Sequence, residues 1–379
     1  MQMIPILQIQ IFFTSLILMN YILWAIGLQN QILSALILVL LLISGISLLI
    51  KIKNTNIIIF FVSMLVASLG IQCWQWDAQT IWLFHAKRIF FDMNLYSQLD
   101  GYDYCCMNDY PNMVPSLSAS IAKSFNIWNE IIPKLSSIFF IFVPIVVLAN
   151  KLKHNVTKTI FLIMLLFFGK KFLINGYIDA LLALNFVSLL VLLDNKEKNN
   201  SIFILAVTTG CLIVLMKNEG VLLYLIAIIS LLISSKWEKK LIFLLIPFIV
   251  YYTTWKYQVS QTELQNFMNI GFHSIDRMIN RLTSKDIFMI VKSISLQLSI
   301  YGSLWVIILA ITMKDKCFNL INILFLSFIG YFSALVLIYL VTPVDLTTHI
   351  GQSIDRITMP LQLILIISLL INFEKKLRP

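Results

Sequence analysis

The first residues able to do chemistry lie where a long apolar segment ends, at Trp76-Asp77-Ala78. An amphipathic stretch, 81–88, follows, and an acidic loop rich in tyrosine then runs to Tyr110. A carboxylate at the end of a transmembrane segment costs free energy, about 2.5–3.5 kcal/mol if it lies deep in the bilayer. Asp77 is therefore the leading candidate for a working residue.

Further charged and polar side chains lie close to the ends of other apolar segments. They are Lys87, Tyr177 and Asp179, Lys217 and Glu219, Arg277, His349 and Arg356. Carboxylates accept hydrogen bonds, while Lys and Arg donate them to anionic oxygens. Such a set, if brought together, suits a substrate that has both hydroxyl and phosphate groups.

The composition places the chain in a bilayer, because 59% of its 379 residues are apolar and only 12% are charged. A bilayer core of about 30 Å needs about 20 apolar residues per helix. We predict an all-α integral membrane protein with about twelve transmembrane helices. The segments lie near 5–27, 32–50, 56–74, 131–150, 159–173, 178–194, 201–216, 220–235, 241–258, 286–311, 318–341 and 358–372.

The orientation follows from the positive charge of the connections. Assigning the short links and the 374–378 tail to the cytoplasm puts 15 of the 28 basic and 5 of the 18 acidic residues there. The other face then has 13 of each, so the bias follows the positive-inside rule. The protein is expected in a bacterial inner membrane with both termini on the cytoplasmic side. The loops 75–130, 259–285 and 342–357 are then on the outer side.

No linker or low-complexity tract divides the chain, so 1–379 is expected to be one polytopic domain with membrane lipids as its surroundings. The basic residues form no stripe, and topology explains the net charge of +10 without a nucleic-acid partner. The outer ends of the helices would then form one polar cavity. Because the outer compartment lacks nucleotide sugars and ATP, a reaction there needs a lipid-borne activated donor or an existing bond.

Several short motifs occur in a recognisable order. They are Trp76-Asp77-Ala78 with Trp82, Ala86-Lys87, Tyr110-Pro111 before Val114-Pro115-Ser116-Leu117, Gly176-Tyr177-Ile178-Asp179, Lys217-Asn218-Glu219-Gly220, and His349 with Ser353-Ile354-Asp355-Arg356. From about residue 70 onward the chain resembles the GT-C membrane glycosyltransferases, nearest to the bacterial protein O-mannosyltransferase-like and aminoarabinose-transferase-like branch. The resemblance implies juxtamembrane helices in 75–130, an acidic catalytic residue there, and a polyprenyl-phosphate sugar as donor.

The chain departs from that family in two places. The usual Tyr-Pro-Pro-Leu reads Tyr110-Pro111-Asn112-Met113, which keeps the first proline and loses the second. An extra helical hairpin also precedes the segment that leads into the acidic loop. Neither change falls on a proposed catalytic residue.

Carried over to this sequence, the resemblance makes Asp77 the general base that takes the proton of an acceptor hydroxyl, which is otherwise a weak nucleophile. The alternative is a carboxylate that caps the following helix. Arg356 and Arg277 would bind the donor phosphate through bidentate hydrogen bonds. The alternative is that each pairs with its neighbour, Asp355 or Asp276.

Lys217 and Glu219 are expected at a tight outer turn with Gly220, where they either contact substrate or simply pair with each other. Asp179, two residues after Tyr177, either contacts the sugar or only faces the positive end of its helix dipole. His349 could donate to phosphate or sugar, and Lys87 could bind phosphate or a lipid headgroup. No Asp-x-Asp motif is present, so no metal or other cofactor is assigned, although a divalent metal stays open.

The sequence thus predicts an inverting glycosyltransferase that moves a sugar from a polyprenyl-phosphate donor to an envelope glycan or lipid acceptor. Two other classes remain open. A polysaccharide polymerase or ligase is also polytopic, but would carry paired arginines in longer outer loops. A glycolipid flippase or transporter would show duplicated halves and charges near the midplane.

Overall fold

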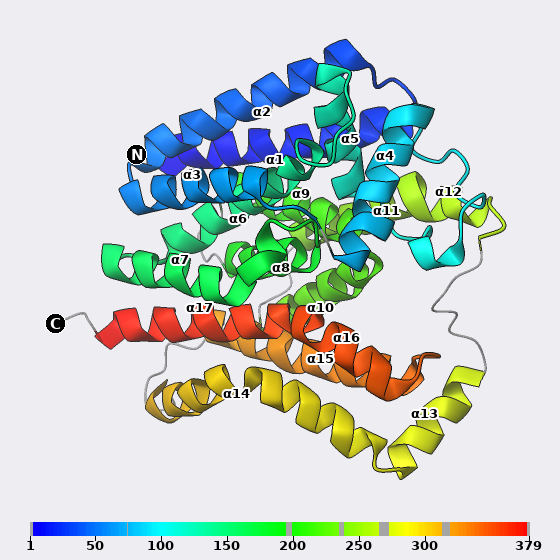
Figure 1. The fold of residues 1–379 in the computed structure, drawn as a ribbon. Coiled ribbons are helices and arrows are strands. Elements are labelled where there is room, and N and C mark those ends of the chain that lie inside the picture. The colour runs from blue at the N-terminus through cyan, green and yellow to red at the C-terminus, as the bar shows by residue number, and fades with distance from the viewer. Residues whose placement is uncertain are drawn as a thin grey trace.

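The computed structural model describes residues 3–73, 75–194, 199–234, 239–264, 273–312 and 319–376. Over these ranges the regular structure is entirely helical (Figure 1). The first half contains α1 (Met3–Ala25), α2 (Gln31–Ile52), α3 (Thr55–Gly70), α4 (Leu83–Asp92), α5 (Met113–Phe125), α6 (Ser136–Lys151), α7 (Asn155–Gly169) and α8 (Asp179–Leu193). The second half contains α9 (Asn200–Met216), α10 (Asn218–Ser234), α11 (Ile246–Tyr251), α12 (Tyr257–Ser260), α13 (His273–Thr283), α14 (Asp286–Thr312), α15 (Asn319–Val341), α16 (Leu346–Ile357) and α17 (Met359–Lys376).

Within the described ranges, five helical spans are long and apolar enough to cross a membrane. They are Pro5–Ala25, Gln31–Ile52, Pro133–Lys151, Ile323–Val341 and Leu346–Glu374. The class predicted from composition, an all-α membrane protein, therefore agrees with the structure. The count of twelve spans is not established by it.

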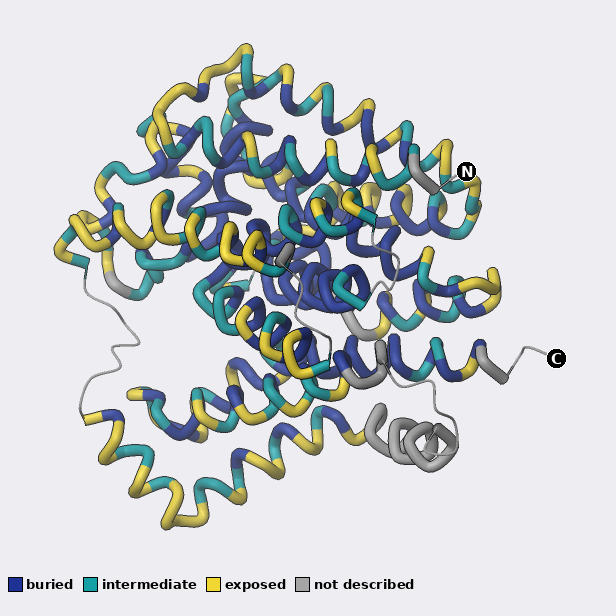
Figure 2. Tube along the Cα trace, turned by 180° about the vertical axis from the view of Figure 1, so that it is seen from behind, coloured by how far each residue is buried: buried dark blue, intermediate teal, exposed yellow. Residues whose placement is uncertain are grey.

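Most of the other predicted spans coincide with helices that are apolar but short. One example is α8, whose 15 residues cover about 22 Å at 1.5 Å per residue, less than the 30 Å of a bilayer core. Almost every residue of α8 is buried, and Figure 2 shows the buried residues gathered in the middle of the molecule. A helix enclosed by other helices does not need to match the bilayer thickness, which explains how α8 can be both short and apolar.

The predicted segment 241–258 is not one regular helix. It consists of a 3₁₀ stretch (Lys239–Leu245), α11, a π-helical turn (Tyr252–Lys256) and α12. Pro247 lies at the start of α11, where its missing N–H costs nothing but where it prevents the preceding stretch from continuing as an α-helix. Hydropathy alone does not report this change of helix type.

The long helices lie side by side, and the N-terminal and C-terminal ends lie at the same end of the molecule (Figure 1). At the other end, α4 and α5 run crosswise to α1 and α2. Both crossing helices come from the predicted loop 75–130. Arg356 precedes α17, whose 18 residues carry the chain about 27 Å back toward the terminal end. The predicted site residues are thus placed away from the termini.

Candidate active site

Five of the charged residues form one connected cluster, which we call the charge cluster: Asp77, Asp179, Lys217, Glu219 and Arg356. Arg356 donates through Nη1 to Asp77 Oδ2, and the same nitrogen lies 3.7 Å from Asp179 Oδ2. The Nζ atom of Lys217 lies 3.0 Å from Asp179 Oδ1 and 3.1 Å from Glu219 Oε1. Asp179 therefore links the two cations.

Each member of the charge cluster lies at the end of a helix. Asp77 precedes the π-helical turn Ala78–Trp82 that leads into α4, and Asp179 is the first residue of α8. Lys217 joins α9 to α10, Glu219 lies in the first turn of α10, and Arg356 lies in the last turn of α16. The ends of these helices therefore meet at one place in the fold.

Gly220 makes possible the tight turn between α9 and α10 in which Lys217 and Glu219 lie. A Cβ atom on Gly220 would lie 1.9 Å from the carbonyl oxygen of Ile213, so no other residue fits without moving α9 from α10. The Gly220 N–H donates to the Lys217 carbonyl at 2.8 Å. The tight turn predicted around these residues is present. It directs Lys217 toward both Asp179 and Glu219.

A second glycine holds the other side of the cluster. Gly176 has φ +92°, a conformation that other residues rarely adopt, and a Cβ atom there would lie 2.9 Å from Ala78 Cβ. The following residue, Tyr177, places its ring 4.7 Å from the Arg356 guanidinium carbon, a cation–π contact. Its hydroxyl donates to Gln75 Oε1 at 3.3 Å.

The charge cluster is mostly shielded from water. The side chains of Asp179 and Lys217 are 7% and 8% exposed, while those of Asp77 and Glu219 are 18% and 27% exposed. Burial alone would lower the pKa of Lys217, but the carboxylates of Asp179 and Glu219 together hold that pKa well above its usual value. With three acids and two bases, the cluster has a formal charge of −1.

These contacts decide between several of the alternative interpretations. Asp77 makes no side-chain capping hydrogen bond, so the helix-cap interpretation of Asp77 is not what the structure shows. Arg356 pairs with Asp77 and Asp179, while its neighbour Asp355 is exposed. Lys217 does pair with Glu219, but it also contacts Asp179.

Two residues beside the charge cluster were missed as site candidates. The ring of Tyr110 stacks on Trp82 with centroids 5.7 Å apart, and Lys217 Nζ lies 5.6 Å from the Tyr110 centroid. Asp109 accepts a hydrogen bond of 2.9 Å from Asn218 Nδ2, and burial raises the pKa of its carboxyl. Tyr110 and Asn218 both stand in the motifs, but only the fold shows that Tyr110 lies beside Lys217 and that Asp109 lies beside Asn218.

His349 lies on α16, seven residues before Arg356, which is about 10 Å along the helix. Its ring is 5.1 Å from that of Tyr339, and its Nδ1 atom is buried with no hydrogen-bond partner in the described ranges. A buried nitrogen without a partner on the side of the helix near the charge cluster is suited to receive a polar group of a substrate.

The remaining predicted residues lie elsewhere. Lys87 is exposed on α4, and within the described ranges no ion pair joins it to the charge cluster. Arg277 lies on α13 and donates to the Val341 carbonyl and to Ser274 Oγ. Arg277 pairs with neither the charge cluster nor the carboxylate of Asp276.

Two further residues of the α4 region support the loop that follows it. His85 is fully buried, its Nε2 atom lies 3.0 Å from the Cys106 carbonyl, and burial lowers the pKa of His85 to about 3. Arg88 donates to the carbonyls of Ser97 and Leu95 at 2.6 and 2.8 Å. Both side chains hold the acidic loop against α4.

The part of the chain that the structure describes contains no group of three or more His, Cys, Asp or Glu residues able to hold a metal ion. The cations beside the carboxylates are instead Arg356 and Lys217. Arg and Lys can stabilise an anionic leaving group by hydrogen bonding.

Comparison with known proteins identifies no relative, since no family model, no curated protein and no solved structure matches the chain.

Proposed function

We propose that the protein is a GT-C-type membrane glycosyltransferase. It moves a sugar from a polyprenyl-phosphate donor to an envelope glycan or lipid on the extracytoplasmic face of a bacterial inner membrane. The single observation that carries this proposal is the charge cluster. It joins Asp77 and Arg356, which lie 279 residues apart, at the end of the molecule away from both termini.

Three features support the choice of reaction class. The cluster combines carboxylates with an arginine and a lysine, the groups that contact sugar hydroxyls and phosphate oxygens. The helices α4 and α5, from the predicted outer loop, run crosswise to α1 and α2 (Figure 1), and Asp77 precedes the helical turn that leads into α4. The motifs that resemble the GT-C enzymes supply each member of the cluster.

In this reaction the oxygen of the acceptor hydroxyl attacks the anomeric carbon of the donor sugar. The bond between that carbon and the phosphate oxygen breaks, and the polyprenyl phosphate leaves with the bonding electrons. The acceptor proton passes to Asp77. Attack opposite the leaving group inverts the anomeric carbon.

Arg356 has a positioning role beside the base. It holds Asp77 through an ion pair and packs on the Tyr177 ring, so the carboxylate has one defined orientation. Asp179 holds Arg356 from the other side, and Lys217 in turn holds Asp179. Glu219 is the most exposed member and is available for a sugar hydroxyl.

The test is mass spectrometry of envelope glycans and glycolipids from the native host. It compares wild type, a deletion strain and an Asp77→Asn strain that makes equal amounts of protein. We expect the deletion and Asp77→Asn to remove the same single sugar mass, with accumulation of the polyprenyl-phosphate sugar. An unchanged glycan profile in Asp77→Asn, with an altered profile in the deletion, would refute the role of Asp77.

The same experiment separates the other classes. Shorter glycans with intact repeat units would indicate a polymerase or ligase. Intact lipid-linked glycans that accumulate on the cytoplasmic face would indicate a flippase. A purified protein that accepts a soluble nucleotide sugar would refute the lipid-linked donor.

A further inference from the structure

Lys134 is a buried cation that the charge cluster does not use. It lies at the start of α6, in the 3₁₀ turn Pro133–Leu135, and is only 2% exposed. Its Nζ atom has no hydrogen-bond partner within the described ranges, and none of the ion pairs found there includes it. A buried ammonium without a partner is unfavourable, and an anion would offset that cost.

A second buried donor without a hydrogen-bond partner in the described part of the chain lies beside Lys134. Lys134 lines a pocket of about 20 Å³, the Lys134 pocket, with Trp82, Leu83, Val114, Ser118, Ser136, Ser137, Gly176, Tyr177 and Leu181. That volume holds about one or two water molecules, so a phosphate enters only if the surrounding side chains move apart. The Nε1 atom of Trp82 is buried and has no partner in the described ranges either. Two buried donors without acceptors thus line the same pocket, beside the hydroxyls of Ser118 and Ser136, which lie 2.8 Å apart.

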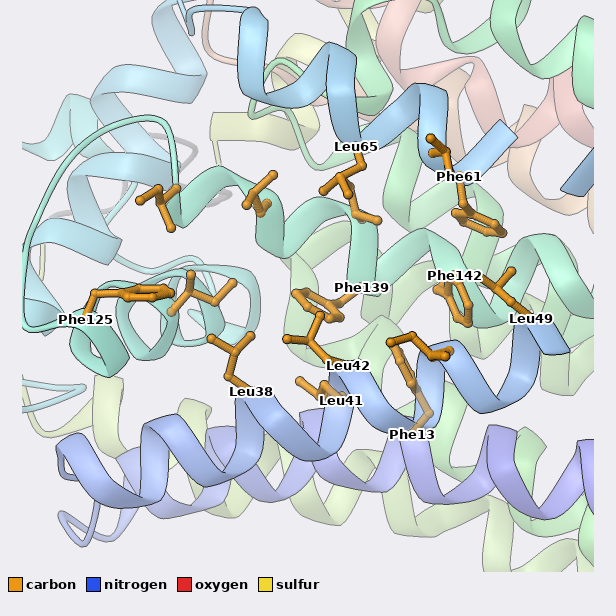
Figure 3. Close-up of a pocket in the computed structure, with 17 residues that line it drawn as sticks. Phe13, Leu38, Leu41, Leu42, Leu49, Phe61, Leu65, Phe125, Phe139 and Phe142 are labelled. Atoms are coloured by element: carbon orange, nitrogen blue, oxygen red, sulfur yellow. The ribbon is translucent and has the colours of Figure 1, made fainter. Parts of the chain in front are cut away.

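An apolar pocket of about 410 Å³ lies next along the same helices. It is lined only by apolar side chains and Gly45, and Figure 3 shows Phe125 at one end and Leu49 at the other. Its lining on α2 runs from Leu38 to Leu49, 11 residues apart or about 16 Å. Because α2 and α6 are apolar enough to cross a membrane, the apolar pocket extends along the depth of the bilayer.

The Lys134 pocket and the apolar pocket share two walls. On α5, Val114 and Ser118 line the first, and Ile121 and Phe125 line the second. These four residues are spaced by four, three and four, so they follow one face of the helix. Around the start of α6, Lys134 lines the first pocket while neighbouring residues such as Leu135 and Ile138 line the second.

We propose that the Lys134 pocket binds the phosphate of a single-chain isoprenoid lipid, with Lys134 and Trp82 as donors, and that the lipid chain lies in the apolar pocket. This inference rests on the lipid-phosphate donor of the proposed function and assigns its binding site. The apolar pocket runs along α2 for about 16 Å and has a volume of about 410 Å³, which suits one lipid chain better than the two chains of a phospholipid.

The charge balance favours this location over the charge cluster. The cluster is formally −1, and its cations already pair with carboxylates. Lys134 has no such partner. Tyr177 borders both regions, since it lines the Lys134 pocket and contacts Arg356. A sugar attached to the phosphate would therefore lie near Tyr177 and Asp77.

Native mass spectrometry of the purified protein in detergent tests the proposal with geranylgeranyl phosphate as the probe. Geranylgeraniol, which lacks the phosphate, and dioleoyl phosphatidic acid, which has two chains, are the comparison lipids. The variants are Lys134→Met, Lys134→Arg and Trp82→Phe, with Lys285→Met as the matched control because Lys285 is exposed. Two further variants test where the lipid chain binds. Gly45→Leu fills the apolar pocket, and the control Gly70→Leu adds the same side chain in open space.

We expect Lys134→Met to weaken binding of geranylgeranyl phosphate roughly tenfold or more, with no loss of geranylgeraniol binding. Trp82→Phe and Gly45→Leu should each weaken phosphate binding, Lys134→Arg should retain much of it, and both control variants should bind as wild type does. The melting temperature of ligand-free Lys134→Met should not fall, because the removed charge has no partner.

Equal binding by Lys134→Met and wild type would overturn the proposal. So would equal affinity for phosphatidic acid, which would assign the site to an ordinary phospholipid. Binding that depends on Lys134 without any sugar transfer would support this site and count against the proposed function. Normal sugar transfer by Lys134→Met would count against this binding site and would support the proposed function.

Discussion

The tetrapeptide Ser-Ile-Asp-Arg occurs twice, at 274–277 in α13 and at 353–356 in α16, and the two copies are used differently. Arg356 enters the charge cluster and pairs with Asp77 and Asp179. Arg277 instead donates to a backbone carbonyl at the end of α15 and to Ser274 of its own helix. Identical local sequence therefore gives one arginine among carboxylates and one that binds the end of a neighbouring helix.

The neighbours of each copy explain the difference. Ile354 is 7% exposed and packs in the core, while Ile275 is 52% exposed. In α16 the packing of Ile354 turns Arg356 toward the ends of α8 and α4. In α13 the isoleucine faces outward, and Arg277 donates to Val341 of α15 and to Ser274 of α13. The position of the helix, and not the tetrapeptide, decides the role of the arginine.

The strongest test of this comparison replaces each arginine in turn. Arg356→Gln leaves the partly buried Asp77 without a cation and leaves Asp179 with Lys217 alone. We therefore expect a loss of about 3–5 kcal/mol of stability and a loss of sugar transfer. Arg277→Gln removes only hydrogen bonds and should cost about 1 kcal/mol with transfer retained. Thermal unfolding in detergent and the transfer assay measure both.

A double variant checks the cause of the first effect. Arg356→Gln combined with Asp77→Asn removes a carboxylate together with its cation, and should recover part of the lost melting temperature without recovering transfer. An equal loss in Arg277→Gln and Arg356→Gln would contradict the contrast between the two copies.

The isoleucines provide the second test. Ile354→Ala creates a cavity and should lower the stability by about 2–4 kcal/mol. Ile275→Ala should change it by about 0.5 kcal/mol or less, because that side chain is already exposed. Melting temperatures of the two variants in the same detergent give the comparison, and similar values would show that α13 is packed as tightly as α16.

The third test concerns the other cation of the charge cluster. Gly220→Ala should force α9 and α10 apart, cost about 1–3 kcal/mol and reduce transfer by displacing Lys217. Gly351→Ala, in α16 near the second tetrapeptide, is the matched control, since nothing lies within 4 Å of its added methyl group. Because alanine favours a helix over glycine, the control should be neutral or more stable. A destabilised Gly351→Ala variant would mean that α16 packs more closely than described.

The smallest effects are expected at the acidic residues of the two copies. Asp276 and Asp355 are both exposed, so Asp276→Asn and Asp355→Asn should each change stability by less than about 0.5 kcal/mol. Transfer should be unchanged in both. Loss of transfer in Asp355→Asn alone would show that Arg356 depends on its neighbour after all.

The predictions that depended on local patterns hold best. The apolar segments are helices, Asp179 lies at a helix start, and Lys217 and Glu219 lie in a tight turn with Gly220. Hydropathy could not count the spans, because enclosed helices such as α8 are as apolar as helices that face lipid. Nor could it show that 241–258 changes helix type three times.

The site was harder to predict, since charge and spacing do not report which distant residues meet. Both arginines of the repeated tetrapeptide were candidates to bind a phosphate, Arg356 more strongly than Arg277, and the packing of α13 and α16 shows where each one lies. Lys87 stood in a motif, yet the structure places it on the exposed face of α4. Lys134 had no sequence signal, because a lysine at the start of an apolar helix is an ordinary boundary residue.

The separation of the ion-pair partners along the chain sets an order of assembly during synthesis. Lys217 follows Asp179 by 38 residues, so that pair can form once the α8–α10 region is made. Arg356 follows Asp77 by 279 residues, so this pair can form only after most of the chain has been made. Until α16 is inserted, the Asp77 carboxylate has to stay in contact with water, because a lone charge in the bilayer is costly. The α4 region is therefore expected to dock against the helices late in biogenesis.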